Sequence, residues 1–262
     1  MKTITQSLIN TFTTCPYRYF LTDVKKMTWF SATEDENAGN RFHLAANRIL
    51  QGIPPESVLK MEGLDREQLE TWLKTYGSLR ADSEVEVSCT LELPGNAETV
   101  LLAGKYDALH AADDTICIYD WKTGKVPSDS EKLRRNPQTR LYCFLAKRLS
   151  ARFCGKEIPA ENIRIIYSYT ERPSVLFEFR YSDEAFGKDE KWLKETAAAM
   201  SASDSSAFPR TEDTKNCRRC PFFSYCGRAP LWQNFEEINE DEILQLSFFD
   251  SPNDPDYEET VF

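Results

Sequence analysis

The chain has 262 residues, of which 41% are hydrophobic and 28% are charged, which is the composition of an ordinary globular protein with a core of normal size. Its N-terminus, MKTITQSLIN, is polar, and no run approaches the roughly 18 apolar residues of a membrane span, so we expect a cytoplasmic protein without a membrane partner. Cysteines should be reduced there, and a cluster of them indicates metal or redox chemistry before disulfides.

The formal net charge of -10 at first argues against a nucleic-acid partner, because phosphate binding requires Lys and Arg. The acidic excess, however, lies in residues 231–262, which contain ten Asp and Glu and no Lys or Arg. Between Lys122 and Arg152 the balance reverses, with nine basic residues against two acidic ones. We interpret residues 122–152 as a local basic strip, for which the alternative is an ordinary solvated helix face.

Residues 3 to about 80 have apolar positions at helical spacing, which predicts a helical N-terminal region. The period then changes to two in residues 83–93, and strands are also predicted over residues 100–109 and 115–122. Three strands in a row make an antiparallel meander the simplest arrangement.

Asn136 and Pro137 predict the start of a helix, with Asn as the cap and Pro at the first helical position, and the apolar spacing continues to about Phe153. Two further strands, NIRIIYSYT and SVLFEFRYS, precede a helix predicted from about Asp183 to Met200. This order predicts an α/β fold with a mixed β-sheet core flanked by helices. The expected regions are a helical N-terminal region (1–82), the core (83–205), a cysteine segment (206–230) and an acidic tail (231–262).

The predicted strand ICIYDWK places Asp120 and Lys122 on one face, because side chains alternate along a strand. A D-x-K tripeptide alone is more typical of a surface ion pair. The preceding strand, however, brings a second carboxylate, Asp107, into the neighbouring segment of a hairpin. Two carboxylates on adjacent strands can hold a divalent metal ion, and a nearby ammonium group can stabilise charge on a phosphate or position a water.

Two further positions are compatible with phosphate or metal chemistry. Gln138 and Tyr142 lie four residues apart, on one face at the N-terminal end of a predicted helix, where partial positive charge favours a phosphate. His43 lies on a predicted helix, and alone it is more typical of a half-buried histidine than of a metal ligand. The chain contains no G-x-x-x-x-G-K-[ST] loop, so we do not expect a helicase or an ATPase.

Three cysteines, Cys217, Cys220 and Cys226, lie within ten residues in the segment NCRRCPFFSYCG. Three thiolates in a short loop can wrap a metal ion or an iron-sulfur cluster, but closed sites of both kinds usually need four protein ligands. A site of four cysteines suits both zinc and an iron-sulfur cluster, so both alternatives stay open.

Taken in order, His43, GKYD, DWKTG and QTRLY resemble the RecB-like branch of the PD-(D/E)XK nuclease superfamily. The resemblance extends to the ends of the chain, because that branch includes AddB-type and CRISPR-associated nucleases with one cysteine near the N-terminus and three near the C-terminus. It implies that Cys15, just before Pro16, is the fourth ligand of a 4Fe-4S cluster together with Cys217, Cys220 and Cys226.

The resemblance also implies the roles of the site residues. Asp107 and Asp120 would bind Mg²⁺ or Mn²⁺ with His43 as a further ligand, and Lys122 would orient or activate the attacking water. DNA contacts are expected from five residues in, or just before, the helix predicted to start at Pro137: Gln138, Tyr142, Arg134, Arg135 and Arg140. The implied activity is hydrolysis of phosphodiester bonds at single-stranded DNA ends.

Three functions follow from this resemblance. The first is a free-standing, metal-dependent DNA exonuclease that serves repair, recombination or CRISPR adaptation. The second is a nuclease subunit whose helicase or CRISPR-adaptation partners are separate proteins. The third is a catalytically inactive iron-sulfur scaffold that only binds DNA, and the presence of Asp107, Asp120 and Lys122 argues against it.

The acidic tail contains the sequence QLSFF, which resembles the short motif by which bacterial DNA enzymes dock in the sliding clamp. Its docking residues would be Gln245, Leu246, Phe248 and Phe249, with Phe248 in place of the usual Leu. One alternative is that the tail packs on the body of the protein. Another is that its carboxylates compete with DNA for the basic strip.

Overall fold

The structure is a computed structural model of the chain, and it describes residues 2–28, 34–77, 79, 83–94, 99–170, 172–202, 204–217 and 220–228. The chain forms two compact units, the first made of Met1–Thr3 and Ser31–Glu195 and the second of Ile4–Phe30 and Thr196–Phe262. In the described ranges, no helix combines the length and the apolar character that crossing a membrane requires.

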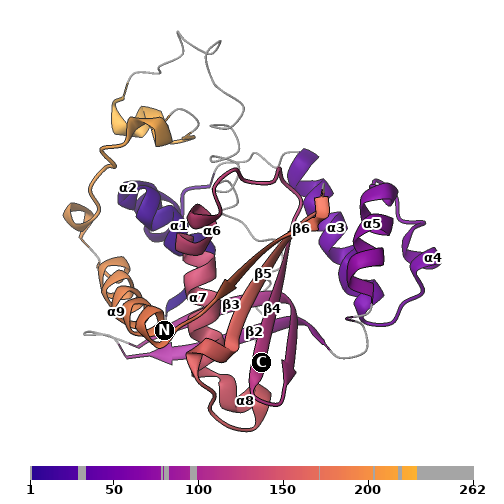
Figure 1. The fold of residues 1–262 in the computed structure, drawn as a ribbon. Helices are drawn as coiled ribbons and strands as arrows, with labels where there is room; N and C mark the ends of the chain where they lie inside the picture. Colours follow the sequence, from indigo (N-terminus) through magenta and orange to yellow (C-terminus); the bar gives the residue numbers. More distant parts are fainter. Residues whose placement is uncertain are drawn as a thin grey trace, which may run out of the picture. The chain divides into compact units, whose positions relative to one another are not determined.

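The first unit is built on a six-stranded sheet with the order β1-β3-β4-β5-β6, in which β2 pairs with β3 (Figure 1). The strands are β1 (Lys2–Thr5), β2 (Glu84–Leu93), β3 (Val100–Ala112), β4 (Thr115–Lys122), β5 (Ile163–Tyr169) and β6 (Arg172–Arg180). β2, β3 and β4 are consecutive antiparallel strands, as predicted, whereas β5 runs parallel to β4 and antiparallel to β6. The mixed sheet confirms the predicted α/β fold class.

Helices cover both faces of this sheet. They are α3 (Glu34–Leu50), α4 (Pro55–Val58), α5 (Arg66–Tyr76), α6 (Ser130–Arg135), α7 (Pro137–Arg148), α8 (Ser150–Cys154) and α9 (Asp183–Met200). Asp120 of β4 contacts Gln138 of α7, whereas the next residue, Trp121, packs on Trp72 and Tyr76 of α5. Because successive side chains of a strand point to opposite faces, α7 and α5 lie on opposite sides of the sheet (Figure 1).

The face toward α3 and α5 has an apolar core centred on Trp72 and Trp121, whose ring centroids lie 5.3 Å apart. Both indole side chains are buried. Burying an aromatic side chain of this size removes roughly 150–250 Å² from water, so these two residues contribute much of the apolar surface buried in this core. Trp121 therefore fixes the end of β4, which carries Asp120 and Lys122.

In the connection between β4 and β5, α7 begins at the predicted position. Asn136 caps the helix, because its Oδ1 accepts a hydrogen bond of 2.8 Å from the Gln138 amide, and Pro137 is the first helical residue. The prediction that one helix continues to Phe153 is wrong. Leu149 leaves the helical conformation with φ -102 and ψ 10, and α8 follows as a separate short helix.

The N-terminal prediction also needs a correction, because Lys2–Thr5 is a strand and not part of a helix. Ile4 of this strand is buried, and the Thr5 hydroxyl accepts a hydrogen bond of 3.3 Å from the Leu8 amide, which caps α1 (Gln6–Thr14). The helical spacing of the sequence therefore begins only after Thr5. Further along, α2 (Pro16–Tyr19) and a π-helical turn (Phe20–Val24) continue the second unit.

The second unit joins these N-terminal helices to three short 3-10 turns (Ser205–Ala207, Thr214–Cys217 and Phe223–Cys226). Its core is aromatic, with Phe208 stacked on Phe20 at 5.4 Å and also close to Phe12 and Tyr19. The Tyr19 hydroxyl donates to the Met200 carbonyl at 3.2 Å. Residues about 190 apart in the sequence thus form one small core within this unit.

Candidate active site

Asp120 and Lys122 lie side by side at the end of β4, on the face that α7 covers. Lys122 Nζ lies 2.7 Å from Asp120 Oδ1, and Asp120 is only 3% exposed. The strand alternation that places both residues on one face is therefore observed. A buried carboxylate with a lysine beside it differs from a surface ion pair, because burial makes the pair costly unless it is fully hydrogen-bonded.

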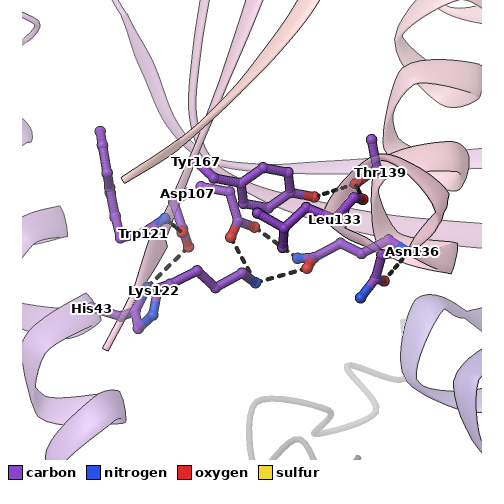
Figure 2. Close-up of polar contacts among 10 residues, drawn as sticks. His43, Asp107, Trp121, Lys122, Leu133, Asn136, Thr139 and Tyr167 are labelled. Carbon is purple, nitrogen blue, oxygen red and sulfur yellow. Dashed lines mark hydrogen bonds and ion pairs between the residues drawn. The ribbon is translucent and has the colours of Figure 1, made fainter. Parts of the chain in front are cut away.

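Gln138, in the first turn of α7, completes this hydrogen bonding. Its Nε2 donates to Asp120 Oδ2 at 2.7 Å, and its Oε1 accepts from Lys122 Nζ at 2.7 Å (Figure 2). Because one amide both donates and accepts, it bridges Asp120 Oδ2 and the ammonium group, while Asp120 Oδ1 is buried with the Lys122 ion pair as its contact. The cap at Asn136 fixes the helix start, and so it also fixes the position of Gln138.

Asp107 of β3 faces the same site from the neighbouring strand. The backbone amide of Trp121 donates to Asp107 Oδ2 at 2.7 Å, and His43 Nδ1 of α3 lies 3.1 Å from Asp107 Oδ1 (Figure 2). The Asp107 side chain is 25% exposed and that of His43 is 35% exposed. The structure therefore brings His43, Asp107, Asp120 and Lys122 together, with Gln138 as a fifth member.

The position of Asp107 depends on a local irregularity of the β2–β3 ribbon. On one side of it, Val85 and its partner Ala108 pack in the core of α3 and α5; on the other side, Tyr106 packs its ring on Tyr142 of α7 at 5.0 Å. Residues 106 and 108 would share a face in a regular strand. The ribbon therefore turns over where Glu86 and Asp107 lie between the regular pairs Val85–Ala108 and Val87–Tyr106.

The backbone conformation of Glu86 accounts for this turn. Glu86 has φ 51, in the left-handed region, and it makes no regular pair with Asp107, although the register on both sides is continuous. Such a conformation costs a non-glycine residue of the order of 1–3 kcal/mol. The strain is located opposite a candidate metal ligand.

The charges of these residues influence one another strongly. Burial raises the pKa of Asp120, Lys122 lowers it and Asp107 raises it, and the net pKa is above the ordinary value. Burial also raises the pKa of Asp107. His43 and the Trp121 amide lower this pKa by a larger amount, so the net pKa of Asp107 lies below its ordinary value. For His43, burial lowers the pKa, but Asp107 outweighs this effect and the net pKa is raised. Two nearby carboxylates therefore repel each other.

The donor set fits a hard divalent cation. Carboxylate oxygens are the ligands that Mg²⁺ and Mn²⁺ prefer, and a cation between Asp107 and Asp120 would relieve their repulsion. Across the described ranges, no three His, Cys, Asp or Glu side chains are already gathered around a point where a metal ion could sit. Binding would therefore have to draw His43 and the carboxylates inward by side-chain rotation.

Tyr167 and Thr139 also belong to this site, although no sequence motif indicates them. Tyr167 is the β5 partner of Asp120, and Lys122 Nζ lies 5.4 Å from the centre of its ring. The Tyr167 hydroxyl is 2.8 Å from Thr139 Oγ1, and Thr139 donates to the Leu133 carbonyl at 2.5 Å. The parallel β4–β5 pairing is the signal that would have placed Tyr167, but it is a long-range contact.

Tyr142 lies in α7 one turn beyond Gln138 and is buried. Burial raises its pKa well above the ordinary value, and Asp120 raises it further. Its ring packs closely on the backbone of β3, where a methyl group added to Gly104 would come within 3.1 Å of Tyr142 and 3.0 Å of Leu145. The glycine of the GKYD motif therefore gives α7 room to approach the sheet.

The arginines of the basic strip differ in their contacts. Arg135 is exposed, and the exposed Arg134 contacts Glu131 at 3.1 Å. Arg140 is mostly buried by its partners, because its Nε lies 2.6 Å from Asp189 and its guanidinium lies 3.7 Å from the Trp192 ring. Arg140 thus ties α7 to α9, whereas Arg134 and Arg135 face solvent.

The predicted cluster ligands lie in the second unit around one pocket that is partly open to solvent. Its lining includes the four cysteines predicted as ligands: Cys15, Cys217, Cys220 and Cys226. None of them forms a disulfide. Burial raises the pKa of the Cys220 thiol. Arg18 lowers this pKa and the thiols of Cys15 and Cys226 raise it, so these groups interact electrostatically. A tetrathiolate site, whether zinc or iron-sulfur, needs four such thiols, but among the described residues no three of them already surround a point where a metal ion could sit, so binding would have to draw them together.

The remaining cysteines lie away from this cavity. Cys89, Cys117 and Cys143 are buried in the first unit, and Cys154 is half-buried at the end of α8. Burial raises the pKa of all four thiols, which makes them poor nucleophiles. The proposed docking residues, Gln245, Leu246, Phe248 and Phe249, lie outside the described residues, so the clamp motif stays a prediction.

Comparisons with known proteins give one family match and two similar solved structures. A protein-family model described as the PD-(D/E)XK nuclease superfamily matches residues 3–76 and 62–227. A crystal structure of SSO0001 is 16% identical, covers 86% of this chain and 86% of that chain, and has a TM-score of 0.46. A crystal structure of a candidate exonuclease from Eubacterium rectale is 10% identical, covers 81% of this chain and 85% of that chain, and has a TM-score of 0.53. No curated protein matches the sequence.

Proposed function

Since the chain belongs to the PD-(D/E)XK nuclease superfamily, we propose that it is a metal-dependent deoxyribonuclease that hydrolyses phosphodiester bonds at the ends of single-stranded DNA. The observation that carries the proposal is the network in which Lys122 Nζ contacts both Asp120 and Gln138 at 2.7 Å. A lysine beside a buried carboxylate adds little to the stability of the fold, because burying both charges is costly. A role in phosphate chemistry explains the pair better.

The chain's own residues would divide the work as follows. Asp107 and Asp120 would hold Mg²⁺ or Mn²⁺, with His43 as a further ligand. When bound, such an ion supplies Lewis-acid activation of water and neutralises charge on the phosphate. Lys122 would orient the attacking water and stabilise charge on the phosphate through Nζ. Gln138 would hold Lys122 and Asp120 in register, and the Trp121 amide would do the same for Asp107.

Two observations bear on the choice of substrate. The structure from Eubacterium rectale is described as a candidate exonuclease, which favours action at DNA ends. Arg134 and Arg135 face solvent just before α7, where they could contact the phosphate backbone of a bound strand. Gln138 and Tyr142 are both buried, so the DNA contacts predicted for them would require the site to open.

We also propose that Cys15, Cys217, Cys220 and Cys226 hold a 4Fe-4S cluster, with zinc as the alternative. The support is their common cavity and the absence of disulfides among them. A cluster at this position would join chain segments about 200 residues apart. Its role in the second unit would be structural, because cleavage of a phosphodiester bond involves no electron transfer.

The test of the nuclease proposal uses Lys122→Met and Asp120→Asn, with the exposed Arg180→Gln in β6 as the control. Linear single-stranded DNA labelled at either end, circular single-stranded DNA and duplex DNA would be incubated with Mg²⁺ or Mn²⁺. We expect both site variants to cleave the linear strand more slowly, by about 10²- to 10³-fold or more, because they lose groups that act on the reacting phosphate. The control should retain full activity.

Two results would contradict parts of this proposal. Full activity of Lys122→Met would remove Lys122 from the active site. Equal cleavage of circular and linear strands would show an endonuclease and overturn the assignment to DNA ends. A wild-type protein that binds DNA but cleaves none of these substrates would support the inactive-scaffold alternative.

A further inference from the structure

Arg228 follows the last of the four cysteines and turns back toward Cys217. Its Nη1 donates to Cys217 Sγ at 3.0 Å, and its Nη2 donates to the Thr211 carbonyl at 2.7 Å. Gly227 lies between Cys226 and Arg228 with φ 61, a left-handed conformation that glycine adopts without strain. The turn at Gly227 therefore aims the guanidinium at a candidate cluster ligand.

We propose that Arg228 is a positioning residue of the cysteine site, which holds the Cys217 sulfur for a bound 4Fe-4S cluster and raises the reduction potential of that cluster. This inference rests on the part of the proposed function that assigns the four cysteines as cluster ligands. It does not depend on the nuclease activity.

The first argument is geometric. The guanidinium is planar and offers several N–H donors in a fixed fork, so it can bind the sulfur and the carbonyl at the same time. The Thr211 carbonyl acts as the anchor, and Cys217 Sγ is then held relative to the loop that precedes it. Partners of this kind orient metal ligands, and their loss typically lowers metal affinity by about 10- to 100-fold.

The second argument is electrostatic. Four thiolates give the site a net negative charge, which increases when a cluster gains an electron. The guanidinium stays positive at all relevant pH values. A positive charge and an N–H donor at a ligand sulfur stabilise the more negative, reduced state, and this raises the reduction potential.

Arg210 provides a matched comparison, because it lines the same cavity. Its guanidinium lies 5.3 Å from the centre of the Tyr17 ring, so it packs on an aromatic side chain. Removing Arg210 would take away a charge near the cavity, whereas removing Arg228 would also take away a hydrogen bond to a ligand sulfur. The difference between the two variants isolates the effect of the hydrogen bond.

The test uses the full chain, purified without oxygen, as wild type, Arg228→Gln, Arg228→Lys and Arg210→Gln. Iron per chain, the affinity for iron in competition with a chelator, and the midpoint potential would be measured. We expect Arg228→Gln to lower the affinity by about 10- to 100-fold and to shift the potential downward. Arg228→Lys should be intermediate because it keeps the charge without the fork, and Arg210→Gln should change both quantities less.

The outcomes separate the role of Arg228 from the assignment of the cysteines as cluster ligands. Wild-type affinity and potential in Arg228→Gln would overturn the role of Arg228 while leaving the cluster and the nuclease proposal intact. Zinc in place of iron in the wild type would overturn both the cluster and this inference, but cleavage of DNA would still test the nuclease separately. Melting of the metal-free proteins would reveal misfolding of Arg228→Gln, in which case Arg228→Lys carries the comparison.

Discussion

The two candidate metal sites of this chain are built differently. In the first unit, Asp107, Asp120 and Lys122 are fixed by hydrogen bonds and ion pairs of 2.7–3.1 Å to Gln138, Trp121 and His43. In the second unit, the four cysteines line one pocket that is partly open to solvent. Cys15 lies between α1 and α2, whereas the backbone around the other three cysteines consists of short turns, one of which is closed by the 3.2 Å hydrogen bond from the Cys220 amide to the Cys217 carbonyl.

The difference indicates what each site requires. The carboxylate site sits on strands and helices whose packing does not involve a metal ion, so the chain itself orders it. Three of the four cysteines lie in short turns without such a framework, and a bound metal would supply much of the order of these turns. We therefore expect loss of metal to stop the chemistry in the first unit and to loosen the structure in the second.

The largest effect should come from loss of the cluster. Cys15→Ser should abolish iron binding and destabilise the folded protein by about 3 kcal/mol or more, because the cluster closes a loop of about 200 residues. This corresponds to a melting temperature lower by roughly 6–12 °C for a protein of this size. Calorimetry of anaerobic protein would measure it.

Chelation of Mg²⁺ or Mn²⁺ is the matched control, because it should stop cleavage with almost no change in melting temperature. A large drop in melting temperature on chelation would show that the carboxylate site is not ordered by the chain. An unchanged melting temperature for Cys15→Ser would show that the aromatic core around Phe208 holds the second unit without metal.

A smaller effect is expected from Gln138→Ala, which removes the amide between Lys122 and Asp120. We expect kcat for DNA cleavage to fall by about 10- to 100-fold while KM changes little, because the amide orients other groups and is itself buried. Steady-state kinetics on a labelled single strand would separate the two parameters. A rise in KM with unchanged kcat would instead support the contact with the DNA backbone that the sequence suggested.

The smallest effect should distinguish two glycines of the first unit. Gly104→Ala should destabilise the protein by about 1–3 kcal/mol, because the added methyl group meets Tyr142 and Leu145 at 3.1 and 3.0 Å. Gly187 lies on the exposed face of α9, where an added methyl group would meet no neighbouring atom within 4 Å. Gly187→Ala should therefore stabilise the protein by about 0.5–1 kcal/mol. Urea unfolding would measure both, and equal shifts of the same sign would contradict the close packing of α7 on β3.

Much of the first unit follows from local patterns in the sequence. Alternation predicts β2, the strands β3 and β4 are also predicted from the sequence, and the Asn136–Pro137 pair predicts the start of α7. Alternation also places Asp120 and Lys122 on one face, since the spacing of two is a property of any strand. These predictions succeed because each depends on residues that are neighbours in the chain.

The remaining features depend on contacts that no local pattern encodes. Tyr167 reaches the site through the parallel pairing of β4 with β5, which forms only after the chain has passed through α6, α7 and α8. The contact of Gln138 with Asp120 depends on how α7 packs on the sheet. The strand at Lys2–Thr5 is a similar case, because its partner is β3, about 100 residues later in the sequence.

The irregularity at Glu86 has a consequence for how the first unit unfolds. Val85 and Ala108 contribute to the core of α3 and α5, whereas Tyr106 contributes to the packing of α7, and all three belong to one two-stranded ribbon. If α7 detached from the sheet, or if α3 and α5 did, apolar side chains of this shared ribbon would be exposed to water. This sharing makes the two layers cooperative, which favours loss of the first unit in a single step.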